Sequence, residues 1–535
     1  MSRLRILLYV DSRVTFTHSL TAAELIRERL GAHITLMLVD SGNNFAEVMK
    51  NYEVYDLRIL FRTQVPSRLW PKAAWIKDLL GCRAGLPIRR SALRPNFLVA
   101  AARRRARRYA HFSAAQRVLI PSLLVWIGGV RFTRFVFKKR DFWIKWLLDT
   151  QKQGTFIRQL CFLLLLRNRI DRFLDEVKPD AIVLAEDNVE TLSTIFVAVA
   201  GKRSIPCIVI PFTIPNSNEP ARYYLNNQLY RAKGPLARFV VWFWPKWLLR
   251  YEGTELLRQP AATALCQELM GFSSPAPWIL NRGKAAAIAL DSEAQSDIYL
   301  RMGFPRAQLR VIGDLNGALF HQILENKRQL TAELFGRHGL KPGRPLVLCG
   351  FPPDQYEGAD SVGFEFLDYH ALIKAWIRSF EDLGDRANVL IRPHPRVRAD
   401  RLNVSLNSNI RLTWEPTAEL IPLSNVYVAA ASSTIRWAIA CGTPVINYDT
   451  FRYRYDDFKA VAGVMPVESL DEFRKLLDAF LDDPAFAGRL VATQRSAMGY
   501  WGELDGKTDE RLAALLLEAV VGTGRSRAVW HGPVQ

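Results

Sequence analysis

Apolar runs of strand length alternate with segments of helical spacing along most of this chain. Near the amino terminus, Leu4–Val10 and His33–Val39 are each a short apolar run, typical of a strand. A polar loop at 11–19 and a helix at Leu20–Leu30 are expected between them. A strand, helix, strand order predicts the opening of a parallel sheet of Rossmann type.

The same alternation continues toward the carboxyl terminus. Further strands of a first domain are expected at Val54–Phe61, Ala181–Ala185 and Cys207–Ile210. The strands expected in a second domain are Ala286–Leu290, Leu309–Asp314, Pro345–Cys349, Val389–Ile391, Val426–Ala430 and Val445–Tyr448. The pattern therefore predicts an α/β protein with two Rossmann-like domains that face a cleft.

The predicted boundaries follow changes in composition. Residues 1–275 form the first domain, which includes a basic, aromatic, mostly helical insertion at about 62–160, and a proline-rich link follows. Residues 284–475 form the second domain, and 476–535 are expected to be helices that pack back on a core. With 535 residues, of which 49% are hydrophobic, the chain has ample material for two cores and is not a disordered protein.

The first candidate site follows the strand at Val426–Ala430. Ser432, Ser433 and Thr434 precede a segment of helical spacing, which Gly442 and the Thr443-Pro444 pair are expected to end. Free backbone donors at the start of a helix, together with small hydroxyl side chains, suit a phosphate group. The alternative interpretation is a simple helix cap.

A second candidate site follows the strand at Val389–Ile391. His394 lies between Pro393 and Pro395, which stiffen the backbone, and Arg392 is close by. An imidazole and a guanidinium at a strand end can donate to a diphosphate or to a leaving phosphate. The alternative is a structural histidine.

Together these two elements resemble the second domain of bacterial glycosyltransferases of the GT-B fold, especially the HP-motif enzymes. That group includes capsule sialyltransferases, Kdo transferases and CDP-glycerol glycerophosphotransferases. The resemblance implies that the donor phosphates are held by His394, Pro395, Ser432, Ser433 and Thr434. One position departs from the pattern, because Trp437 stands where related transferases often have a glutamate on the ribose.

Acceptor activation requires a general base, which is expected at strand ends of the first domain. The candidates are Asp187, which is favoured, Glu186 and His18. The Glu186–Asp187 pair resembles the acidic element of HP-motif sialyltransferases, although Asn188 replaces its glycine. No Asp-x-Asp element follows a predicted strand, so we expect a metal-independent transferase. We also expect it to be inverting and to need no cofactor.

Positive charge is concentrated in one segment. The formal net charge is +20, and the stretch from Leu79 to Arg140 holds fifteen arginines and lysines but no acidic residue. Aromatic residues are interleaved with these cations, and they recur at 239–250. We therefore expect an anionic membrane surface to contact residues 83–146 and 239–250, and we expect no nucleic-acid partner. A solvated basic face is the plainer alternative.

The function expected is that of a glycosyltransferase with a CMP- or CDP-activated sugar donor. The acceptor would be a membrane-associated glycan or lipid-linked molecule in surface polysaccharide synthesis, such as capsule or lipopolysaccharide. Six dispersed cysteines without a CxxC pair favour a reducing compartment, so we expect a cytoplasmic protein, peripheral at the inner face of the cytoplasmic membrane. The alternatives are a nucleotide-sugar 2-epimerase and a polyanion- or nucleic-acid-binding protein that uses the basic insertion.

Overall fold

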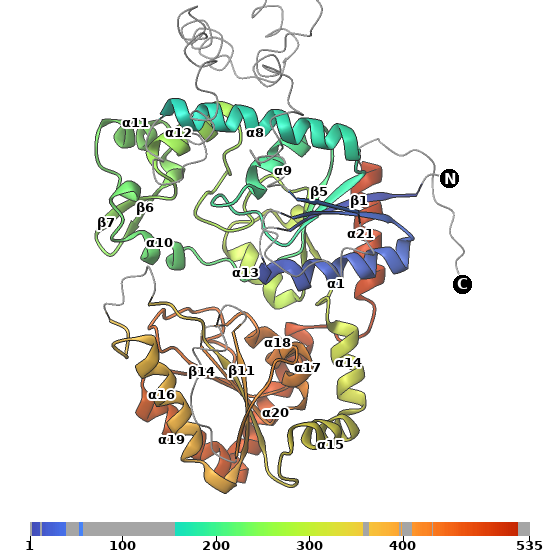
Figure 1. Cartoon of the computed structure of the whole chain (residues 1–535), viewed down its shortest axis with the longest axis vertical. Coiled ribbons are helices and arrows are strands. Elements are labelled where there is room, and N and C mark those ends of the chain that lie inside the picture. The colour runs from blue at the N-terminus through green and yellow to red at the C-terminus, as the bar shows by residue number, and fades with distance from the viewer. Residues whose placement is uncertain are drawn as a thin grey trace, which may run out of the picture.

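The chain folds around two parallel sheets, one above the other in Figure 1. The computed structural model describes residues 3–10, 13–38, 53–56, 156–356, 363–394, 397, 409–430 and 432–522. The basic segment at 83–146 and most of the predicted insertion lie outside these residues, as do Pro395 and Arg396.

The first sheet has seven strands, and every neighbouring pair is parallel. In spatial order the strands are β3 (Glu53–Asp56), β2 (His33–Leu38), β1 (Arg5–Val10), β4 (Ala181–Leu184), β5 (Cys207–Val209), β8 (Ala287–Leu290) and β9 (Leu309–Val311). The centre of the sheet is buried on both sides, which explains why its strands are apolar runs rather than alternating patterns.

Helices cover both faces of this sheet. One face carries α8 (Phe156–Val177), α9 (Ser193–Lys202) and α12 (Ala261–Met270). The other carries α1 (Arg13–Leu30) and, from the far end of the chain, α21 (Thr508–Gly522). In Figure 1, α21 lies beside α1 although nearly 500 residues separate them in sequence.

The first helix begins earlier than its pattern suggests. The sequence predicted a polar loop as far as residue 19, but α1 already begins at Arg13. Its first turns bury Thr15, Phe16 and Ser19, and no glycine or proline interrupts them. His18 is therefore fixed on a helix rather than carried on a loop.

The second sheet has six strands, again all parallel. Their spatial order is β12 (Ile410–Leu412), β11 (Asn388–Pro393), β10 (Leu346–Phe351), β13 (Val426–Ala429), β14 (Val445–Tyr448) and β15 (Val464–Val467). The helices α16 (Tyr369–Glu381) and α19 (Leu470–Asp482) cover one face. The other face packs against α14 (Gly317–Glu325), α15 (Lys327–His338), α17 (Thr417–Leu420), α18 (Ile435–Ala440) and α20 (Pro484–Trp501). Two parallel α/β sheets with helices on both faces confirm the predicted pair of Rossmann-like domains.

Two strands belong to a different sheet from the one predicted. The sequence pattern predicted Ala286–Leu290 and Leu309–Asp314 in a second domain that starts at residue 284. In the structure, β8 pairs with β5 and β9 pairs with β8, so both extend the first sheet. The chain enters the second domain only after β9, through α14. An apolar run identifies a strand but not its neighbour, because pairing depends on the path of the chain between strands.

Several smaller elements complete the first domain. They include α10 (Asn218–Tyr224), α11 (Pro235–Phe243), α13 (Glu293–Arg301) and the antiparallel hairpin of β6 (Leu248–Tyr251) and β7 (Thr254–Leu257). Short 3-10 helices span Gln228–Tyr230, Pro245–Trp247, Arg306–Gln308, Gly384–Arg386 and Ile421–Leu423. Within the described residues, no helix is both long enough and apolar enough to cross a membrane.

Candidate active site

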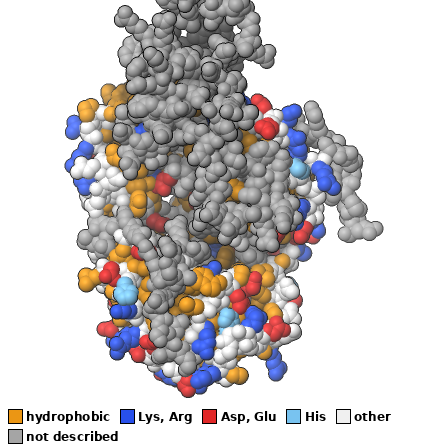
Figure 2. Space-filling model, in the orientation of Figure 1, with side chains coloured by type: hydrophobic (Ala, Val, Ile, Leu, Met, Phe, Trp, Pro, Cys, Tyr) orange, Lys and Arg blue, Asp and Glu red, His pale blue; other side chains and the backbone are white. Residues whose placement is uncertain are grey.

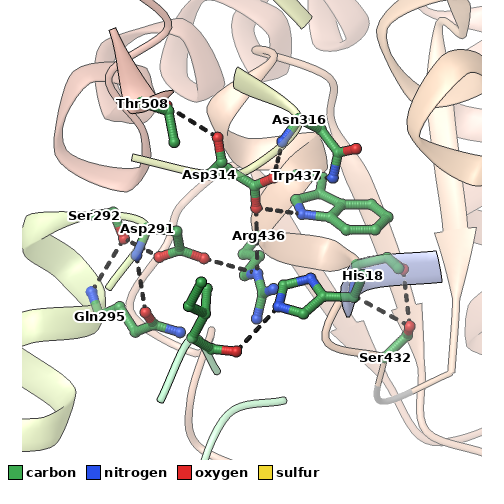
Figure 3. A network of polar contacts seen from close by, with 12 residues as sticks. His18, Asp291, Ser292, Gln295, Asp314, Asn316, Ser432, Arg436, Trp437 and Thr508 are labelled. Atoms are coloured by element: carbon green, nitrogen blue, oxygen red, sulfur yellow. Dashed lines mark hydrogen bonds and ion pairs between the residues drawn. The ribbon is translucent and has the colours of Figure 1, made fainter. Parts of the chain in front are cut away.

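The two domains meet where strands of the first sheet end. Asp291 directly follows β8 and Asp314 lies three residues after β9, while Arg436 and Trp437 lie on α18 of the second domain. Figure 3 shows these four side chains pointing toward one another. Ligands of open α/β sheets bind beyond the carboxyl ends of the strands, so this junction is the first place to look for a site.

A buried ion pair crosses the junction. Arg436 Nε lies 2.8 Å from Asp291 Oδ2 and 3.9 Å from Asp314 Oδ2. Burial raises the pKa of Asp291, and the adjacent Arg436 cation works in the opposite direction. The Trp437 indole donates to Asp314 Oδ2 at 2.6 Å. The indole that replaces the expected ribose-binding glutamate is thus engaged by the other domain.

His18 lies in the same network, beside the Arg436 guanidinium (Figure 3). Its Nε2 is 3.0 Å from the carbonyl oxygen of Ile210, just after β5. A carbonyl can only accept, so Nε2 carries the proton and Nδ1 carries the lone pair of the neutral ring. Desolvation lowers the pKa of His18 to about 4, and the Arg436 cation adds to this. At neutral pH the imidazole is therefore uncharged and able to accept a proton.

The Ser-Ser-Thr turn connects β13 to α18, as the sequence predicted. The Thr434 hydroxyl lies 2.8 Å from Ser432 Oγ and 2.7 Å from the buried Tyr427 hydroxyl, and the Thr434 backbone N–H donates to Ser432 Oγ at 3.3 Å. Helix α18 ends at Ala440, and Gly442 follows with a φ of +69°, the left-handed conformation that stops a helix. The turn is held firmly by its own hydroxyl groups.

The two predicted phosphate elements are not on neighbouring strands. Strand β10 lies between β11 and β13, and its Gly350 is in register with Arg392 on one side and Ala429 on the other. A Cβ at Gly350 would come within 2.3 Å of the Tyr427 hydroxyl, so this narrow place requires glycine. The absence of a side chain at Gly350 leaves room for the Tyr427 hydroxyl beside the strand that separates the two elements.

Arg392 and His394 lie at the end of β11 and just beyond it. Arg392 Nε donates to the carbonyl oxygen of Glu415 at 2.9 Å, and its guanidinium lies 5.8 Å from the centre of the Trp414 ring. Burial lowers the pKa of Arg392. The His394 carbonyl accepts from Val397 at 2.8 Å, and its side chain is half-buried, while Pro395 lies outside the described residues. Arg392 therefore contacts the segment that follows β12.

Glu186 follows β4, near the middle of the first sheet, and is half-buried. Desolvation raises the pKa of Glu186 to about 7, and the nearby carboxylates of Glu190, Asp187 and Glu219 contribute, while a hydrogen bond with Asn188 opposes the shift. A carboxyl group with this pKa exchanges protons readily at neutral pH.

Asp187 is enclosed instead. It is 3% exposed, and its Oδ1 accepts from the Thr194 hydroxyl at 2.5 Å. Its backbone N–H donates to Asn281 Oδ1 at 2.8 Å, and its carbonyl accepts from the Asn281 N–H at 2.9 Å. Desolvation raises the pKa of Asp187 to about 6. These contacts tie the end of β4 to the segment before β8.

The residues that join the domains were not predicted from the sequence. Asp291, Asp314 and Arg436 were not singled out for a role, although each acidic residue comes shortly after an apolar strand. That signal was available, but the partner Arg436 lies more than 120 residues further along the chain. Only the tertiary structure brings them together.

No protein-family model and no curated protein sequence matches the chain. Among solved structures it is similar to CalG4, the calicheamicin glycosyltransferase, at 12% identity and TM-score 0.49, over 98% of this chain and 99% of that one.

A second similar structure is UDP-GlcNAc 2-epimerase from Neisseria meningitidis, at 11% identity and TM-score 0.44, over 97% of this chain and all of that one. A third is the wall teichoic acid polymerase TagF, at 13% identity and TM-score 0.41, over 66% of this chain and 77% of that one. The class to which the chain belongs is set by its own two parallel sheets: an α/β protein with the two-domain architecture of the GT-B fold.

Proposed function

We propose that this protein is a glycosyltransferase that moves a sugar from a nucleotide-activated donor, of the CMP or CDP type, to a membrane-associated glycan or lipid-linked acceptor. Surface polysaccharide synthesis at the inner face of the cytoplasmic membrane would be its setting. The observation that supports this best is the neutral His18 imidazole at the contact between the two domains. Its Nδ1, unprotonated in the neutral ring, is a proton acceptor at the sheet edge where ligands of open α/β sheets bind.

In this proposal the second domain binds the donor. The hydroxyls of Ser432, Ser433 and Thr434, with His394 and Pro395 as the resemblance implies, hold the nucleotide phosphates. Arg392 adds positive charge at the end of β11. Positive groups and hydrogen-bond donors stabilise the charge that develops on the departing phosphate. No metal ion is required for that role.

The first domain supplies the base. His18 Nδ1 takes the proton of the acceptor hydroxyl as its oxygen attacks the anomeric carbon, and the bond from that carbon to the phosphate oxygen breaks. Attack opposite the leaving group inverts the anomeric configuration. Of the three candidate bases, His18 is placed beside α18, Glu186 is half-buried at the end of β4, and Asp187 is enclosed. We therefore favour His18, with Glu186 as its competitor and Asp187 in a supporting position.

The donor site is tested by thermal unfolding in the presence of CMP, CDP, UMP, UDP, GDP and ADP. A ligand at about 100 times its Kd stabilises the native state by about 2.7 kcal/mol, which gives a clear rise in Tm. We expect a rise with cytidine nucleotides that is lost in His394→Ala and in the Ser432→Ala, Ser433→Ala double variant. A rise with UDP or GDP alone would contradict the proposed donor.

The base is tested by turnover. The assay measures release of free nucleotide from the nucleotide sugar that binds, with a membrane extract as the source of acceptor. The rate should fall at least about 100-fold in His18→Ala, which is the lower end of the range for loss of a general base. His321→Ala is the matched control, because His321 is exposed on α14 and pairs with Glu325 on its own helix. Full activity in His18→Ala would exclude His18 as the base. Epimerisation of the sugar without an acceptor would favour the 2-epimerase alternative.

A further inference from the structure

Helix α11 has one face in a core and one face in water. Gly234, with a φ of +91°, and Pro235 begin the helix. Ala237 and Val240 are buried in a small core with Trp247 of the following 3-10 helix, α12 and β7. On the opposite face Phe239 is 43%, Trp242 81% and Phe243 55% exposed. The helix therefore presents large apolar rings to solvent.

These exposed rings form one continuous surface. The ring centres of Phe239 and Phe243 lie 4.7 Å apart, those of Trp242 and Phe243 5.3 Å apart, and those of Phe243 and Trp244 5.7 Å apart. Leu236 is also exposed on this helix. Single exposed hydrophobic residues are common on soluble proteins, but a contiguous cluster marks an interaction surface. We name Leu236, Phe239, Trp242 and Phe243 the α11 face.

Two exposed basic residues, Lys233 and Arg238, lie beside this surface or on its helix. Residues 220–251 contain six arginines and lysines and no acidic residue. Lys233 and Arg238 are exposed, and neither side chain pairs with a carboxylate in the described part of the chain. Figure 2 shows hydrophobic and basic side chains together at the upper left of the molecule, where Figure 1 places α11. A partner for this face should combine apolar material with negative charge.

We propose that the α11 face is a docking surface for a membrane that contains anionic phospholipid. Tryptophan and phenylalanine rings are favoured at the level of the headgroups, and lysine and arginine bind the phosphates beside them. Nine residues of helix span only about 14 Å, less than half of a hydrocarbon core of about 30 Å, so α11 lies in the interface and does not cross it.

This surface is narrower than the segment that the sequence indicated. In the run 239–250, Trp247 is buried in the core of the domain, and Leu248 and Leu249 belong to strand β6. Lys246 pairs with Glu268 at 2.9 Å, and Arg250 with Glu255 at 3.1 Å. The residues free to contact lipid are therefore those of the α11 face, with Lys233 and Arg238.

Docking through the α11 face would hold the enzyme at the membrane, where a lipid-linked acceptor lies, and in this way it deepens the proposed function. Only this link to the acceptor rests on the proposed function. The exposed rings and the local charge stand without the transfer reaction, and membrane binding can be measured separately from nucleotide binding.

The test is co-sedimentation of the full chain with phosphatidylcholine vesicles, with and without phosphatidylglycerol. We expect binding to the anionic vesicles only, with affinity reduced at least about tenfold by Trp242→Glu with Phe243→Glu, a loss equivalent to about 1.4 kcal/mol. Leu367→Glu is the matched control, because Leu367 is 95% exposed on the second domain, between β10 and α16. That variant should bind as the unaltered protein does.

Further variants distinguish lost membrane binding from lost folding. Trp242→Ala alone, with an unchanged thermal unfolding curve, separates lost binding from lost folding, and Lys233→Gln with Arg238→Gln should weaken binding and reduce its dependence on salt. Unchanged sedimentation of these variants would overturn the proposal. So would loss of binding only when Arg103, Arg104, Arg105, Arg107 and Arg108 are neutralised. Nucleotide-induced stabilisation should persist in every α11 variant, so a failure of the donor site would be seen separately.

Discussion

At the scale of single residues, burial shifts the pKa values of two candidate bases, His18 and Glu186, in opposite directions. Burial disfavours the charged form of any group, so it lowers the pKa of the His18 cation to about 4 and raises that of the Glu186 acid to about 7. At pH 7 His18 is neutral and its Nδ1 is unprotonated, whereas about half of Glu186 is protonated. Each residue can accept a proton, but over a different range of pH.

The pH dependence of kcat/KM distinguishes them. A base must be deprotonated to act, so activity is lost as the pH falls through its pKa. If His18 is the base, activity should be nearly constant from pH 8 down to about pH 5. If Glu186 is the base, activity should already fall by about half near pH 7 and about tenfold for each further unit. We expect the first profile, and Glu186→Gln should leave it unchanged. A fall in kcat/KM near pH 7 that disappears in Glu186→Gln would exclude His18 as the base.

At the scale of elements, the loop after β4 is held by a close approach of two backbone segments. Asp187 hydrogen-bonds through its backbone to Asn281, and a Cβ at Gly283 would lie 1.7 Å from Asp187 Oδ2. A contact of that length is impossible, so the segment before β8 can pass over the end of β4 only with glycine at this position. This close approach fixes the loop that carries Glu186.

Gly283→Ala should therefore lower the free energy of unfolding by about 1–3 kcal/mol, the usual cost of forcing extra atoms into a packed region. Urea unfolding followed by circular dichroism measures the change. Gly201→Ala is the matched control, because Gly201 lies near the end of α9 with open space around its Cβ position. Alanine is favoured in a helix, so that variant should be unchanged or slightly more stable. Equal effects of the two substitutions would contradict the close approach.

At the scale of the whole molecule, buried charges join the domains. Arg436 of α18 pairs with Asp291 after β8, and both side chains are almost completely enclosed. The C-terminal helices add a covalent connection, since α20 belongs to the second domain and α21 packs beside α1 in the first. The relative position of the two candidate half-sites thus depends on these contacts and on the packing of α13 against α20.

Removing one member of a buried pair leaves the other charge uncompensated, at a cost of about 3–5 kcal/mol. We expect Arg436→Leu to destabilise the protein by about this amount, and Asp291→Asn in the same chain to restore a large part of it. A double-mutant cycle in thermal or urea unfolding measures the coupling. The exposed pair of Arg454 and Glu468 is the control, and its coupling should be at most about 1 kcal/mol. Additive effects of Arg436→Leu and Asp291→Asn would show that the two residues do not stabilise each other.

The sequence by itself determined the fold class and most of the strands. Apolar runs such as those of β1, β4, β10 and β13 are visible because burial of both faces of a parallel sheet demands them. It also determined the turn at Ser432–Thr434, since small hydroxyl residues before a helix have a local cause.

Only the tertiary structure decided which strands are neighbours and which distant side chains meet. It moved β8 and β9 into the first sheet, placed β10 between the two predicted phosphate elements, and started α1 early enough to fix His18 on a helix. It also enclosed Asp187, brought Arg436 to Asp291, and divided the 239–250 run into a buried core and an exposed α11 face. These features depend on contacts between residues far apart in sequence, and a local pattern contains no information about the partner.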